Sequence, residues 1–142
     1  MKLIRLLQQA YAIEIGAFEA YEGHWRSLKT PQERGLIQAI QLEEVEHREN
    51  VERMLKELGA KPNRFYNAIL YVIGKSISIG CRFMGYRLAM WGAGIMEKLG
   101  GACYKRIARE ARDEGYPAMA VDLDEMQAAE ERHETFFKDV LS

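Results

Sequence analysis

The chain has 142 residues, of which 48% are hydrophobic and 29% are charged, so it is long enough to bury one sizeable core. Its formal net charge of −1, without any run of basic residues, argues against a dedicated nucleic-acid binder. The two cysteines lack metal-motif spacing, the first residues carry charge too early for a secretory signal, and no apolar run reaches the ~18 residues of a membrane-spanning helix.

The first predicted helix covers about residues 2–27. Its apolar residues recur at steps of three and four, which is the spacing of one helix face. That face comprises Ile4, Leu7, Tyr11, Phe18, Tyr21 and Trp25. Glu14 falls in the middle of the same stripe, where a core residue is expected. His24 is offset from the stripe, and we predict that it lies at the surface or in a turn.

The second predicted helix covers about residues 31–58. Its start is marked by "TPQE", in which Thr30 is a predicted N-cap, and its end is marked by Gly59. Its apolar stripe comprises Leu36, Ile40, Val51, Met54 and Leu58. In the middle of the helix, the spacing of three and four continues only if Glu44 and His47 belong to the stripe. These two residues form a Glu-x-x-His motif.

Two further helices are predicted at about residues 83–113 and 117–141, after an apolar crossover at about residues 60–82. The stripe of the third helix comprises Met90, Ala93, Glu97, Tyr104, Ile107 and Ala111. The stripe of the fourth helix comprises Met119, Leu123, Met126, Glu130, His133, Phe137 and Val140. The fourth helix therefore repeats the Glu-x-x-His motif, and each of the four stripes carries a carboxylate near its middle.

The predicted turns place these carboxylates at matching heights. Residues that are level in an antiparallel hairpin are equidistant from its turn. The midpoint of positions 14 and 44 is 29, and that of positions 97 and 130 lies between 113 and 114, beside predicted turns in both cases. Long helices with short turns are typical of bundles. We therefore predict an all-α single domain over residues 1–142, a ferritin-like four-helix bundle of two antiparallel hairpins joined by a long apolar crossover.

The predicted core contains four carboxylates and two imidazoles, with no Lys or Arg on the same stripes. A buried carboxylate must be paired, protonated or bound to a metal. Oxygen and imidazole ligands suit two divalent ions of iron or manganese, and the lack of thiolate disfavours structural zinc. A single Glu-x-x-His is common on helix surfaces, so the prediction depends on its repetition. The predicted metal-ligating and catalytic residues are Glu14, Glu44, His47, Glu97, Glu130 and His133.

Four segments resemble the demethoxyubiquinone hydroxylases of ubiquinone biosynthesis, within the ferritin-like di-iron carboxylate superfamily. The segments are "YAIEIGAFEAYEGH", "LEEVEHRENVERML", "LAMWGAGIMEKLGGACYKRI" and "AAEERHETFF". The resemblance implies two iron ions as cofactor. It implies bridging by Glu44 and Glu130. It also implies one terminal carboxylate per iron from Glu14 and Glu97, and nitrogen ligands from His47 and His133.

The resemblance further implies a di-iron monooxygenase that hydroxylates the ring of a lipophilic quinone precursor of the demethoxyubiquinone type. Dioxygen is the oxidant, and an external electron donor supplies two electrons. The expected location is peripheral, on the cytoplasmic side of the inner or plasma membrane, and otherwise cytoplasmic. The apolar crossover, with Lys75, Arg82 and Arg87 at its margins, suits a membrane interface. The alternatives are that it packs on the bundle or forms a homodimer contact.

Three other functions stay open at this point. The first is a ferroxidase or small storage protein, which handles iron and has no organic substrate. The second is a peroxide-reducing protein of the rubrerythrin type, a class that often carries an additional Cys-rich iron domain. The third is a non-enzymatic bundle in which the metals are structural. The apolar crossover favours the hydroxylase, because a soluble storage protein has less need of it.

Overall fold

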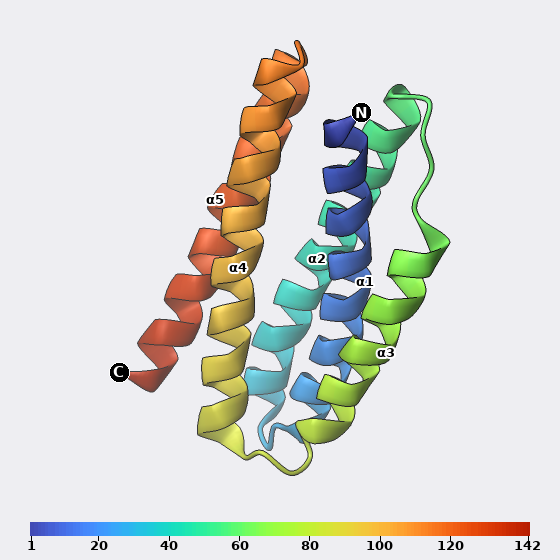
Figure 1. The fold of residues 1–142 in the computed structure, drawn as a ribbon. Coiled ribbons are helices and arrows are strands. Elements are labelled where there is room, and N and C mark those ends of the chain that lie inside the picture. The colour runs from blue at the N-terminus through green and yellow to red at the C-terminus, as the bar shows by residue number, and fades with distance from the viewer. The chain divides into compact units, whose positions relative to one another are not determined.

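The computed structural model describes residues 1–142 and is all-helical, as predicted (Figure 1). Its five helices are α1 (Lys2–Ser27), α2 (Pro31–Glu57), α3 (Arg64–Gly80), α4 (Tyr86–Asp113) and α5 (Pro117–Leu141). The chain divides into two compact units. We call Leu7–Tyr86 the α1–α3 unit, and Arg87–Ser142 together with Met1–Leu6 the α4–α5 unit. No helix combines the length and the apolar character that a membrane-spanning segment requires.

The start of α2 is fixed by the predicted cap. Thr30 has an extended backbone, and its hydroxyl accepts a hydrogen bond from the backbone N–H of Glu33 at 3.2 Å. The same hydroxyl donates to the Glu33 carboxylate at 3.0 Å, so the two side chains are joined at the start of the helix. Only three residues separate α1 from α2, so the two helices form a tight hairpin. Gln41 of α2 ties them together by donating to the backbone carbonyl of Phe18 at 3.1 Å.

Most of the predicted crossover is helical in the structure, because α3 occupies residues 64–80 of it. The Asn63 side chain caps this helix by accepting from the backbone N–H groups of Phe65 and Tyr66. The following helix, α4, starts at Tyr86 rather than near residue 83. Gly85 has a φ of +76°, which lies outside the right-handed helical region, so an α-helix cannot include this residue. Helix α4 therefore begins only after it.

Helix α3 lies against α1 at glycines, and the two run in the same direction (Figure 1). A Cβ added at Gly74 would overlap the carbonyl oxygen of Gly16, and one added at Gly23 would overlap Ser78. A Cβ added at Gly16 would lie 2.8 Å from the carbonyl oxygen of Leu70. The two backbones therefore approach too closely for larger side chains, and the inner face of α3 packs on α1.

Two expectations about burial are wrong. His24 is only 3% exposed, rather than at the surface, because α3 covers a second face of α1 near Gly23. Its ring stacks on Tyr21 with centroids 6.1 Å apart. Burial lowers the pKa of His24 to about 4, since the charged imidazolium is disfavoured away from water. In α2, the predicted core residue Leu36 is exposed, and its neighbour Ile37 is buried instead.

The α4–α5 unit is a second helical hairpin, to which the first turn of α1 is attached. The turn between its helices contains Gly115 and is closed by a 2.7 Å hydrogen bond from Tyr116 N–H to the carbonyl of Ala111. The backbone N–H of Leu3, at the start of α1, donates to the Glu114 carboxylate at 3.0 Å. An amide at a helix start has no partner within its helix, so this carboxylate supplies one.

Candidate metal centre

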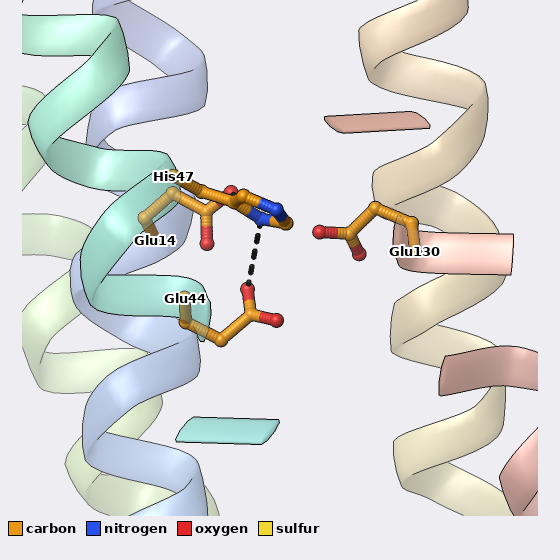
Figure 2. A group of neighbouring side chains, drawn as sticks. All are labelled: Glu14, Glu44, His47 and Glu130. Atoms are coloured by element: carbon orange, nitrogen blue, oxygen red, sulfur yellow. Dashed lines mark ion pairs between the residues drawn. The ribbon is translucent and has the colours of Figure 1, made fainter. Parts of the chain in front are cut away.

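In the α1–α3 unit, one carboxylate of α1 meets a carboxylate and an imidazole of α2. We call Glu14, Glu44 and His47 the first triad. Residues 44 and 47 share one face of α2 because they are three positions apart. His47 Nδ1 lies 3.8 Å from Glu14 Oε1 and 3.9 Å from Glu44 Oε2. Figure 2 shows these side chains pointing toward one another, and it also labels Glu130 of α5.

In the α4–α5 unit, two glutamates and one histidine meet in the same order. We call Glu97 of α4 and Glu130 and His133 of α5 the second triad. His133 Nδ1 lies 3.2 Å from Glu97 Oε2, which is within hydrogen-bonding distance. The three residues are at most 5% exposed, as are those of the first triad. Each triad therefore combines one glutamate from the first helix of a hairpin with Glu-x-x-His from the second.

Each triad has the chemistry of a site for a hard divalent cation. Within each one, every residue offers a ligand atom within 4.8 Å of those of the other two. The donors are carboxylate oxygens and imidazole nitrogens, without a thiolate, which suits iron or manganese. Two ionised carboxylates and one neutral imidazole carry a charge of −2, which one divalent ion balances. The residues therefore fit the group that the sequence predicts.

The comparison with protein families decides the wider assignment. The family model described as "Ubiquinone biosynthesis protein COQ7" matches residues 1–136 of the 142 residues. This chain belongs to the COQ7 family. The resemblance to the demethoxyubiquinone hydroxylases is thereby confirmed, and membership implies a hydroxylase role in ubiquinone biosynthesis. Comparison with curated proteins and with solved structures gave no match.

In this COQ7-family protein, two tyrosines that share a helix face with a triad glutamate lie in the core. Tyr21 and Tyr104, two turns beyond Glu14 and Glu97 on the same helix faces, are buried at 5% and 2% exposure. That burial agrees with a packing role for the two rings.

One buried polar residue of the hairpin was missed from the sequence. Gln41 is 5% exposed and donates to the Glu22 carboxylate at 2.9 Å, in addition to its bond with α1. That hydrogen bond lowers the pKa of Glu22, since it stabilises the charged form. The available signal was position: Gln41 lies three residues before Glu44, on the same face of α2.

Proposed function

We propose that the two triads together bind two iron ions, and that this protein hydroxylates the ring of a lipophilic quinone precursor of the demethoxyubiquinone type. The observation that carries the proposal is the duplicated buried triad in a COQ7-family chain. Two triads supply a charge of −4, which matches two ferrous ions. In this proposal, Glu44 and Glu130 would be shared between the two ions, and each of the other four residues would hold one ion.

The two histidines are proposed to bind through Nδ1. In both triads this nitrogen is the one that lies near the carboxylates. A metal-binding nitrogen must carry a free lone pair, so the ring proton belongs on Nε2 in both residues. The chain thus contributes a fixed tautomer, fixed carboxylates and a site from which water is largely excluded. Bound ferrous iron would supply the ability to bind and reduce dioxygen.

The overall reaction balances with an external donor. A ring C–H, dioxygen, two electrons and two protons give the ring C–OH and water. The two electrons must come from outside the chain, because the product retains one oxygen atom and the other is reduced to water.

A single-turnover experiment tests this proposal. The protein is loaded with Fe(II) without oxygen, mixed with a demethoxyquinone and exposed to ¹⁸O₂, and the quinone is analysed by mass spectrometry. We expect a gain of one labelled oxygen with the parent protein and with Glu131→Ala, whose side chain is exposed. Glu130→Ala should abolish the gain. Rapid iron oxidation with an unchanged quinone would instead support the iron-handling alternative.

We also propose that the outer face of α3 meets a membrane interface, where a polyprenyl quinone resides. The exposed side chains of this face are Phe65, Ile69, Val72, Ile73 and Ile79. Residues 64–83 contain no acidic side chain, and their charges are Arg64, Lys75 and Arg82. Lys75 forms an ion pair with Glu19 of α1 at 3.3 Å, so its charge is already balanced. The positive charges of Arg64 and Arg82 are therefore the ones most available to anionic headgroups.

Vesicle flotation distinguishes this proposal from a homodimer contact through the same face. Vesicles with anionic lipid should carry the parent protein upward, and Val72→Glu should remain in the lower fraction. Gln38→Glu, a substitution at an exposed position of α2 that also adds one negative charge, controls for the change of charge. If the parent protein does not float, and light scattering shows that Val72→Glu converts a dimer to a monomer, the face is a subunit contact.

A further inference from the structure

The second triad contains a close approach that the first triad lacks. Gly100 lies one helical turn after Glu97, on the same side of α4. A Cβ added at Gly100 would overlap Oε2 of Glu130 and would lie 3.1 Å from its Cδ. The Glu130 carboxylate therefore occupies the space that any side chain at position 100 would need.

The approach is specific to the carboxylate of Glu130. At the next residue, Gly101, an added Cβ would lie 3.5 Å from Glu130 Cβ, which is an ordinary van der Waals contact. The packing of α4 on α5 thus leaves room for a methyl group at 101, whereas at 100 the Glu130 carboxylate fills that space. In α1, the position one turn after Glu14 is Ala17, so the first triad already accommodates a methyl group there.

We infer that Gly100 is a positioning residue, whose missing side chain lets the Glu130 carboxylate lie against α4 within ligand distance of Glu97 and His133. This inference rests on the proposed function, because it assigns the carboxylate so placed to metal binding. A methyl group at 100 displaces Oε2, whereas it would lie 3.7 Å from Cγ of Glu130, which is an ordinary van der Waals contact. The displacement must then be absorbed by rotation of the carboxylate away from its partners.

Metal titration tests the inference without relying on turnover. Co(II) is added without oxygen, binding is followed by the visible absorption of the bound ion, and stoichiometry is checked by elemental analysis. We expect Gly100→Ala to weaken the binding of both ions, which share Glu130 in the proposed function, roughly 10- to 100-fold, the range seen when groups that orient metal ligands are removed. The matched control, Gly101→Ala, should bind both ions as the parent protein does.

A double-mutant cycle separates positioning from a general packing effect. If Gly100 acts through the Glu130 carboxylate, Gly100→Ala should cause no further loss of affinity when Glu130→Ala is already present. An equal loss in both backgrounds would overturn the inference. So would a Gly100→Ala variant that binds two ions with parental affinity.

The melting temperature of each variant shows whether a loss of metal binding results from unfolding. If Gly100→Ala alone unfolds, Gly100→Ala/Glu130→Ala should recover the melting temperature of Glu130→Ala, because the overlap partner is gone. Failure of that recovery would contradict the inference. A parent protein that binds fewer than two ions would instead overturn the proposed function, and the inference with it.

Discussion

Helices α1 and α4 each provide the first glutamate of a triad, but their other faces differ. In α1, Gly16 and Gly23 form a surface against which α3 packs. In α4, the exposed side chains of one face are large and apolar: Leu88, Trp91, Ile95 and Leu99 are 40% to 60% exposed. A helix can therefore present a triad glutamate inward while its outward residues differ in size and in what they contact. The triad depends on the spacing along one face, and the neighbours on other faces are set separately.

The largest expected effect comes from removing a glutamate that the proposal shares between the two ions. Glu44→Ala and Glu130→Ala should each lower iron content below one ion per chain, because the loss of a bridge affects both ions. Elemental analysis after anaerobic loading and gel filtration measures the content. The exposed neighbours Glu46→Ala and Glu131→Ala are the controls. Two irons retained by either buried variant would show that the ligand assignment is wrong.

The contact between α1 and α3 should be the next most sensitive feature. Gly74→Ala should destabilise the protein by about 1–3 kcal/mol, since the methyl group overlaps a backbone oxygen that cannot rotate away. Gly94→Ala in α4 should cost less, because its Cβ would lie 3.2 Å from Phe137 Cβ. Urea denaturation at fixed metal content measures both. At Gly35 of α2, where nothing lies within 4 Å, alanine should instead stabilise by roughly 0.5–1 kcal/mol.

Acid should weaken the α1–α3 unit through His24. The pKa of His24 falls from 6.5 to about 4 in the folded chain, so the unfolded chain takes up the proton first. Its contribution to stability is full above pH 6.5 and is lost as the pH falls toward 4. Between pH 7.5 and 5, His24→Gln should remove about 2 kcal/mol of the pH-dependent loss seen in the parent protein. Equal pH dependence in both proteins would contradict this assignment.

A smaller loss of stability is expected from the way in which the second helix of each hairpin begins. Helix α2 starts at the Thr30 side-chain cap, whereas α5 follows Tyr116, which makes no side-chain capping hydrogen bond. Thr30→Ala should therefore cost about 1 kcal/mol in the free energy of unfolding. Tyr116→Ala should show no capping loss. A comparable loss at both positions would mean that the cap is not what distinguishes the two turns.

The parts of the structure that the sequence predicted are those fixed by local rules. The cap at Thr30 and the Glu-x-x-His spacing depend on residues a few positions apart, and both appear in the structure as expected. The period of a helix is also local, but positions 36 and 37 fit steps of three and four almost equally well. The structure buries Ile37, which the stripe through Leu36 did not include.

The parts that the sequence did not predict depend on which elements cover which faces. Helix α3 is apolar on several sides, so its periodicity could not show which side packs on α1. The burial of His24 follows from that packing and was missed for the same reason. Gly100 lies between Glu97 and Tyr104 of a predicted core stripe, but its closeness to Glu130 depends on how tightly α4 and α5 approach.

The attachment of Leu3 to Glu114 has a consequence for how the protein is made. The α4–α5 unit is discontinuous, because Met1–Leu6 belongs with Arg87–Ser142. During synthesis the first turn of α1 emerges long before its carboxylate partner exists. Contacts between such distant positions form late, since a long loop must close first. A nascent chain can thus form most of the α1–α2 hairpin early. Its first six residues can pack on the α4–α5 unit only after the α4–α5 turn has left the ribosome.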